Sequence, residues 1–179
     1  PVNYPDGRLN GYEIEFRQQL GRLWSPLEGL AFGANATFID SEVTLDEADA
    51  NRLADAGYPE ASRDMLNAPS RLYNLNLTYD IARSGTKLGL FYFVKGDTLV
   101  AGAATDIGYI PNVYATEFET LNFTLSQRVG KHLKVTFKVK NLTDPVIQEV
   151  YRSNYIAEDV VKKAYRKGVE YSLGLTATW

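Results

Sequence analysis

The stretch GVEYSLGLTATW, residues 168 to 179, decides the fold of this chain. Its side chains alternate in character, and successive residues of a strand point to opposite faces. One face is apolar and consists of Val169, Tyr171, Leu173, Leu175, Ala177 and Trp179. The other is small or polar and consists of Gly168, Glu170, Ser172, Gly174, Thr176 and Thr178. A soluble sheet would bury the apolar face in a core, whereas a strand of an outer-membrane barrel would turn it toward lipid, with its final aromatic at the interface.

The same alternation returns in six earlier segments, which gives seven candidate strands in all. The earlier segments span residues 12–20, 30–39, 71–81, 88–94, 121–129 and 133–140. A tilted strand needs about 9 to 11 residues to cross the hydrocarbon of a bilayer, and most of these segments have about that length. Glu117 and Glu119 break the pattern because they share the parity of Leu121. We expect these two carboxylates to lie above the lipid or beside a β-bulge.

The connections between the segments alternate strictly between short and long. The short ones are residues 21–29, 82–86 and 130–132, and the long ones are 40–70, 95–117 and 142–167. Outer-membrane barrels have short periplasmic turns and long extracellular loops, and counting back from a periplasmic C-terminus places every connection on its expected side. The sequence therefore predicts an all-β, transmembrane antiparallel barrel sheet. A soluble sandwich of about seven strands also alternates and remains the competing fold.

Composition narrows the functional classes. The chain has 179 residues, of which 45% are hydrophobic and 23% charged, with a net charge of −3 and no cysteine. This balance does not indicate a nucleic-acid partner, and without cysteine there is neither a disulfide scaffold nor a Cys-based metal site. No run of 18 apolar residues indicates a transmembrane helix, but alternating strands leave the average hydropathy unremarkable even in a membrane barrel.

We find no catalytic constellation in the sequence. The one histidine, His132, lies in a three-residue connection without a second histidine or a cysteine nearby, so a metal site or a catalytic triad is not indicated. Glu13 and Glu15 form a carboxylate pair that could serve acid–base chemistry, but on the polar side of a strand they are more simply lumen or loop charges. We expect no enzymatic activity, no cofactor and no metal.

Three features together resemble the C-terminal part of a TonB-dependent receptor. They are GYEIEFRQQLGRLWSPLEGLAFGANATFIDSEV at residues 11–43, NLTDP at residues 141–145, and the aromatic end of the last strand. The resemblance spans essentially the whole chain and implies a barrel of 22 strands whose lumen holds a plug carrying the TonB-contacting segment. Neither the plug nor that segment is visible here. We therefore expect residues 1–179 to be the C-terminal part of the barrel domain.

The last strand also resembles the signal that the barrel-assembly machinery of the outer membrane recognises. That signal combines a polar residue, a glycine two positions later and hydrophobic residues ending in an aromatic; the corresponding positions are Ser172, Gly174, Ala177 and Trp179. Ala177 is a weak hydrophobic residue, so the match is imperfect. The aromatic could equally be an interfacial anchor alone, and the sequence allows both roles.

Residues 40–64 form an acidic segment in which we expect a short helix from about 45 to 56. Thr44 and Glu47 have the spacing of a capping box, and Gly57 is a suitable C-terminal stop. A calcium site using Asp46, Glu47 and Asp49 is conceivable, but the regular spacing of known calcium loops is missing. A solvated acidic helix is the simpler interpretation.

Two sets of side chains are candidates for ligand contacts. On the outer side we predict a group of tyrosines that would stack on a sugar or surround a chelate, or else pack the loops together: Tyr58, Tyr109, Tyr114, Tyr151, Tyr155 and Tyr165. On the lumen side we predict a basic column of Lys134, Lys138 and Lys140. This column would contact the plug or guide anionic substrates, or simply line a wet lumen.

The predicted function is that of an outer-membrane receptor of a Gram-negative bacterium. What the resemblance implies is uptake of a scarce nutrient with TonB-derived energy; iron chelates such as siderophores come first, followed by cobalamin and carbohydrates. The expected partners are outer-membrane lipid, the barrel-assembly machinery, the TonB system through the plug, and the nutrient itself. The alternatives are a small or structural outer-membrane barrel without active transport, and a soluble β-sandwich binding module.

Overall fold

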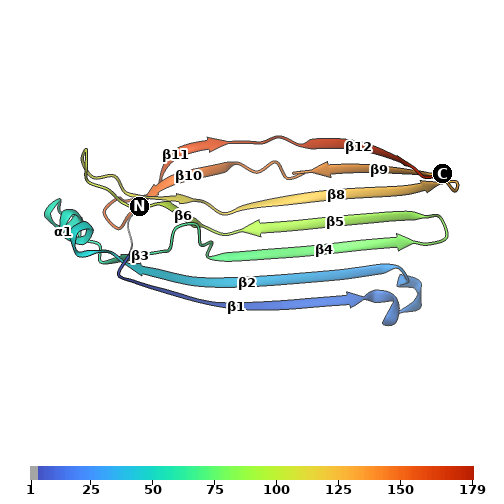
Figure 1. The fold of residues 1–179 in the computed structure, drawn as a ribbon, viewed down its shortest axis with the longest axis horizontal. Helices are drawn as coiled ribbons and strands as arrows, with labels where there is room; N and C mark the ends of the chain where they lie inside the picture. The colour runs from blue at the N-terminus through green and yellow to red at the C-terminus, as the bar shows by residue number, and fades with distance from the viewer. Residues whose placement is uncertain (1–3) are drawn as a thin grey trace.

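The computed structural model describes residues 4–179, and these form an almost entirely β structure (Figure 1). The strands are β1 (Asp6–Gln19), β2 (Leu30–Thr44), β3 (Ser62–Arg63), β4 (Arg71–Ile81), β5 (Thr86–Lys95), β6 (Thr98–Ala101), β7 (Asn112–Ala115), β8 (Phe118–Val129), β9 (Leu133–Lys140), β10 (Ile147–Arg152), β11 (Val160–Tyr165) and β12 (Glu170–Ala177). The helical elements are α1 (Glu47–Asp55) and the 3-10 turns η1 (Leu20–Arg22) and η2 (Ser25–Leu27). Within residues 4–179, no helix has the length and apolar character needed to cross a membrane.

The large sheet contains all seven candidate strands. Its order is β1-β2-β4-β5-β8-β9-β12, with the short β3 paired to β2, and every pairing is antiparallel. The long connections gather at one end of the sheet, and the short turns and the C-terminus lie at the other (Figure 1). The predicted antiparallel β fold and the two-sided arrangement of its connections are thus confirmed, although β1 and β2 extend further toward the long loops than expected.

The register separates the side chains of the large sheet onto two faces. From β2 to β12, one row of directly opposed residues is apolar and contains Phe32, Leu77, Leu90, Phe123, Val139 and Tyr171; on β1 the row ends at Gln18. The adjacent row on the other side contains Ala31, Thr78, Gly89, Thr124, Lys138 and Ser172. We call these two sides the apolar face and the polar face. Because a shift of one residue would exchange them, the register is fixed by which face avoids water.

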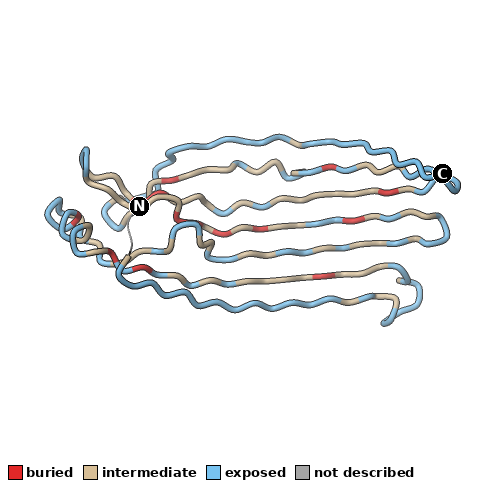
Figure 2. The backbone as a smooth tube through the Cα atoms, in the orientation of Figure 1, coloured by how far each residue is buried: buried red, intermediate tan, exposed pale blue. Residues whose placement is uncertain are grey.

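The large sheet is a single layer, and its two faces are open. Strand contacts join neighbours within a sheet, and Leu173 on the apolar face keeps 69% of its surface exposed. Figure 2 shows exposed or intermediate residues along most of the strands. A soluble β-sandwich would instead require two stacked sheets with their apolar faces together. The described residues therefore lack the layer that the soluble alternative needs.

A second sheet continues four strands of the large sheet, beyond the end where the long connections gather (Figure 1). Its order is β11-β10-β7-β6, which repeats the order of the strands β12, β9, β8 and β5 to which they connect. The best-buried side chains lie here: Leu99, Val113 and Val150 are 2% exposed or less. The sequence showed only long connections in this region, because strands of four to six residues are too short for alternation to stand out. We call this second sheet the outer sheet.

The NLTDP segment forms the junction between β9 and β10. Asn141 and Asp144 both have positive φ, at 59° and 40°. The Asn141 side-chain amide donates to the Gly168 carbonyl at 2.8 Å, and the Gly168 N–H donates to Asp144 Oδ1 at 2.9 Å. The Asn141 N–H donates to Asn122 Oδ1 at 3.0 Å. The motif thus ties the break between β9 and β10 to the break between β11 and β12.

Helix α1 forms where the sequence predicted it, but with a different cap. Thr44 is the last residue of β2, so the expected capping box is wrong. The helix is capped by Asp46, whose side chain accepts the Asp49 N–H at 2.7 Å. Gly57 ends the turn with a φ of 85°, a conformation that favours glycine.

The two glutamates that broke the alternation lie at the loop end of the sheet. Strand β8 pairs with β5 without a register shift, so the bulge interpretation is wrong. Glu119 stays on the apolar parity and accepts a hydrogen bond from the Tyr92 hydroxyl. Glu117 pairs with Arg71 Nε at 2.6 Å. Each carboxylate therefore has a polar partner where the strands approach the long loops.

Candidate functional site

Three tyrosines from three different long connections meet at the loop end. Tyr58 follows α1, Tyr109 lies between β6 and β7, and Tyr155 lies between β10 and β11. The rings of Tyr58 and Tyr109 are stacked, with centroids 3.7 Å apart and planes at 8°. Tyr155 meets both edge-on, at 5.3 and 6.3 Å. We call these three rings the tyrosine cluster.

The hydroxyl groups of the tyrosine cluster also bind neighbouring loops. Tyr155 donates to the Pro59 carbonyl at 2.8 Å, and the Tyr109 hydroxyl is 2.6 Å from Ser153 Oγ. Of the two roles that the sequence allowed, the structure shows the packing of loops on one another. Tyr155 nevertheless keeps 46% of its surface exposed, so an aromatic surface remains accessible at this position.

Tyr114 of β7 lies beside the cluster in a more polar setting. Its hydroxyl donates to Asp64 Oδ2 at 2.9 Å, and the Arg152 guanidinium lies 4.8 Å from its ring centroid. Burial raises the pKa of Tyr114 above its usual value, and the hydrogen bond to Asp64 raises it further. The phenol therefore stays neutral and acts as a hydrogen-bond donor at physiological pH.

Arg152, at the end of β10, joins three segments of the loop region. Its Nε and Nη2 atoms donate to Asp159 Oδ2 at 2.9 and 2.6 Å, and Nη1 donates to Asp97 Oδ2 at 2.7 Å. The hydrogen bonds to Asp159, and then the one to Asp97, raise the pKa of Arg152. Sequence reasoning missed this residue because its partners lie 7 and 55 positions away, without a recognisable spacing.

A polar cavity of about 260 Å³ opens next to the tyrosine cluster. Its lining includes Glu60, Arg63, Asp64, Asn112, Arg152 and Tyr155. Asn112 is buried, and both polar atoms of its side chain form hydrogen bonds. Its Oδ1 accepts the Ala103 N–H at 2.7 Å, and its Nδ2 donates to Glu60 at 2.6 Å. Charged and amide groups converging beside aromatic rings can hold a polar ligand by hydrogen bonds and stacking.

The other predicted tyrosines lie apart from the cluster. Tyr151 is in β10, where Lys162 Nζ is 6.0 Å from its ring centroid. Tyr165 is in β11, where Lys163 Nζ is 5.0 Å from its ring centroid. Within residues 4–179, no ring pair connects either residue to Tyr58, Tyr109 or Tyr155.

The basic column lies on the polar face, along β9. Lys138 stands opposite Thr124 and Ser172, whereas Lys140 pairs with Glu170 at 2.9 Å. Lys134 and Lys138 form no ion pair with any described residue. The placement matches a lumen surface, and the role of the column remains a prediction.

The residues predicted to form the assembly signal lie in or just after β12, one of the two edge strands of the large sheet. Ser172 and Gly174 are on the polar face of β12, Ala177 is its last residue, and Trp179 follows it fully exposed. A Cβ on Gly174 would come no nearer than 3.8 Å to the Thr136 carbonyl oxygen, so β9 does not require glycine there. One edge of β12 has no partner among the described strands. An unpaired edge can pair with a strand of another protein, as recognition by the assembly machinery would require.

The candidate metal ligands are occupied otherwise. Asp46 caps α1, and Asp49 forms an ion pair with Arg52, so the conceivable calcium set is not assembled. In the part of the chain that the structure describes, no three acidic, histidine or cysteine side chains form a metal-binding group. His132 Nδ1 lies 2.8 Å from the Thr178 carbonyl oxygen and belongs to the turn between β8 and β9.

Comparison with known proteins identifies the family of the chain. The family model described as TonB dependent receptor-like, beta-barrel matches residues 1–142, which include the 11–43 segment that carried the resemblance. No curated protein and no solved structure matches the chain. Members of this family are outer-membrane receptors of Gram-negative bacteria, and the two-faced sheet with its long loops at one end is consistent with such a barrel. Because the match covers most of its length, the chain belongs to the TonB-dependent receptor-like β-barrel family.

Proposed function

We propose that the protein takes up a scarce nutrient across the outer membrane with energy supplied through TonB. The family match over residues 1–142 carries this proposal. Residues 1–179 then form the C-terminal part of a barrel of 22 strands, and the plug that contacts TonB lies elsewhere in the full-length protein. The apolar face contacts lipid, the polar face lines the lumen, and the long connections lie outside the cell.

The ligand meets the protein first at the tyrosine cluster and the polar cavity beside it. Tyr155 has an exposed aromatic surface, and the polar cavity beside the tyrosine cluster is lined by carboxylate, guanidinium and amide groups. This combination suits a ligand with both flat and strongly hydrogen-bonding parts, as in an iron chelate of the siderophore type, cobalamin or a carbohydrate. The other two predicted tyrosines, Tyr151 and Tyr165, lie outside this surface and serve as an internal reference.

The test is uptake by cells that carry the full-length protein as their one receptor of this family. A labelled ferric chelate, cobalamin and an oligosaccharide are supplied separately to strains with and without functional TonB. We expect one of the three to accumulate only when TonB is functional. Equal accumulation in both strains would contradict energised transport and favour a passive barrel.

The contribution of the loops is tested with two matched variants. Tyr155→Ala removes the exposed ring of the cluster, whereas Tyr165→Ala removes a tyrosine of the outer sheet that lies apart from it. We expect Tyr155→Ala to weaken ligand binding to whole cells about tenfold or more, the effect expected for a stacking aromatic in a binding site. Tyr165→Ala should bind as the unmodified protein does. Equal losses in both variants would remove the cluster from the ligand site.

A further inference from the structure

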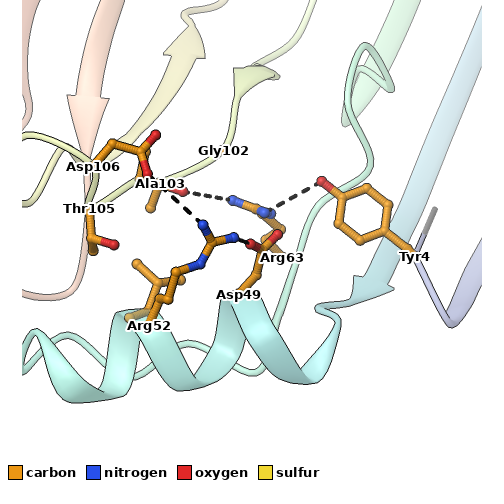
Figure 3. A pocket seen from close by; sticks show the side chains of 10 residues that line it. Tyr4, Asp49, Arg52, Arg63, Gly102, Ala103, Thr105 and Asp106 are labelled. Carbon is orange, nitrogen blue, oxygen red and sulfur yellow. Dashed lines mark hydrogen bonds and ion pairs between the residues drawn. The ribbon is translucent and has the colours of Figure 1, made fainter. Parts of the chain in front are cut away.

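A second cavity, of about 230 Å³, lies between α1 and the connection that follows β6 (Figure 3). Its lining includes Tyr4, Asp49, Arg52, Arg63, Ala103 and Asp106. Two arginine side chains reach it from different elements: Arg52 from α1, and Arg63 from β3. It differs from the cavity beside the tyrosine cluster, although Arg63 belongs to the walls of both.

Arg63 is poorly satisfied in this position. Its Nε atom is buried and has no hydrogen-bond partner among the described residues 4–179. Nη1 is 3.5 Å from the Ala103 carbonyl oxygen and Nη2 is 3.4 Å from the Tyr4 hydroxyl, both at the outer limit of hydrogen bonding. No carboxylate within residues 4–179 forms an ion pair with it.

The surroundings hold this unpaired cation in place. The Arg63 guanidinium carbon lies 5.7 Å from the centroid of the Tyr4 ring, a cation–π distance. A Cβ on Gly102 would overlap the guanidinium, so the glycine provides the space that Arg63 occupies. A guanidinium cannot lose its proton in a protein, and a partly buried charge without a counter-ion is unfavourable. Arg63 therefore keeps unused capacity to bind an anionic group.

The second arginine already has its own carboxylates. Arg52 pairs with Asp49, one turn earlier in α1, and its Nη1 is 4.0 Å from Asp106 Oδ1. Asp49 and Asp106 thus pair with Arg52, whereas Glu60 and Asp64, which line the neighbouring cavity with Arg63, form no ion pair with it among residues 4–179. The planar fork of donors of Arg63 matches the two oxygens of a carboxylate or a phosphate group.

We propose that this cavity is a binding site for an oxyanion, either a carboxylate or a phosphate group, with Arg63 as the charged ligand. A volume of about 230 Å³ accommodates such a group with its nearest atoms and is smaller than most sites for whole ligands. The anion is either free in the medium or part of a larger molecule held by the loops. The site requires only the loop geometry and does not depend on the proposed transport.

The test measures binding of inorganic phosphate and of acetate to the detergent-purified full-length protein by titration calorimetry. Sodium chloride at equal ionic strength serves as the reference, because a general charge effect would appear there too. We expect saturable binding of at least one of the two anions. Arg63→Gln should lower the affinity at least about tenfold, the usual scale for losing a charge-assisted hydrogen-bond pair. Arg22→Gln, at the opposite end of the sheet, is the matched control and should bind normally.

Two further variants keep the result interpretable if Arg63→Gln does not fold. Gly102→Ala retains the arginine but forces its guanidinium to move, and Arg63→Lys retains the charge without the planar fork. Both should weaken binding in protein that still shows heat-modifiable migration. Unchanged affinity in these two variants, or no binding of either anion to the unmodified protein, would overturn the proposal. Competition between phosphate and the transported nutrient would identify the anion as part of the nutrient, and simultaneous binding would identify a separate free-anion site.

Discussion

An arginine placed at Leu77 should destabilise the protein strongly, because this residue lies in the middle of β4 on the apolar face. It stands directly between Phe32 of β2 and Leu90 of β5, and 39% of its surface is exposed. An arginine on the lipid face near the bilayer midplane costs about 2 to 4 kcal/mol. At about 1.4 kcal/mol for each factor of ten, the folding equilibrium should fall roughly 30-fold to 1,000-fold.

The neighbouring residue provides the control for Leu77→Arg. Thr78 points to the polar face, where its direct neighbours are Ala31 and Gly89. Asp80 lies two positions further on the same face, where it pairs with Lys87, so this face already carries charged groups. We therefore expect Thr78→Arg to change the stability by no more than about 0.5 kcal/mol, as for an ordinary solvated position.

The assay is equilibrium unfolding of the two full-length variants in lipid vesicles, followed by tyrosine and tryptophan fluorescence and by heat-modifiable migration. The membrane reasoning predicts a large difference between two substitutions that are adjacent in sequence and identical in chemistry. Equal stabilities for Leu77→Arg and Thr78→Arg would refute the assignment of the apolar face to lipid. A larger loss for Thr78→Arg would indicate that the two faces had been exchanged.

Three further predictions concern the loops and the terminus. Arg152→Ala should accelerate proteolytic cleavage between β10 and β11, and lysine should not rescue it because it lacks the bidentate fork; cleavage rates of the folded protein check this. The pKa of Tyr114 is raised in the folded state, which favours its neutral form. Its stabilising contribution is therefore complete below about pH 10 and is lost as the pH rises through the folded-state pKa. Amide exchange in the outer sheet should increase over that pH range in the unmodified protein, but not in Tyr114→Phe. Deleting Trp179 should lower the ratio of membrane-inserted to periplasmic protein if the residue belongs to the assembly signal, and an unchanged ratio would leave it an interfacial anchor.

The sequence contained enough information for the large sheet but not for the outer sheet. Strands of 8 to 15 residues repeat their two-residue period often enough to stand above chance. Strands β6 and β7 have four residues each, and their pairing depends on partners far along the chain. The helix cap was misplaced by two residues because Thr44 belongs to β2, where it pairs with Asp6 of β1 and Ser62 of β3.

The sequence predicted at which end of the sheet the candidate site lies, but not which side chains contact one another in it. Counting strands placed the tyrosines at one end of the sheet, and three of them do meet there. The stack of Tyr58 on Tyr109 and the position of Arg63 depend on how separate loops close on one another. Such contacts carry no periodic signal, and Gly102 shows its importance only when the neighbouring guanidinium is seen.

The four interrupted strands have a mechanical consequence. The strands break at nearly the same level, at residues 96–97, 116–117, 141–146 and 166–169. We call this line of breaks, between the large sheet and the outer sheet, the seam. The outer sheet has its own buried side chains around Leu99. The outer sheet should therefore unfold and refold as its own cooperative unit, with hydrogen-exchange rates distinct from those of the large sheet. Under the proposed function, sequence changes in the outer sheet and its loops can alter ligand recognition without disturbing the strands of the large sheet.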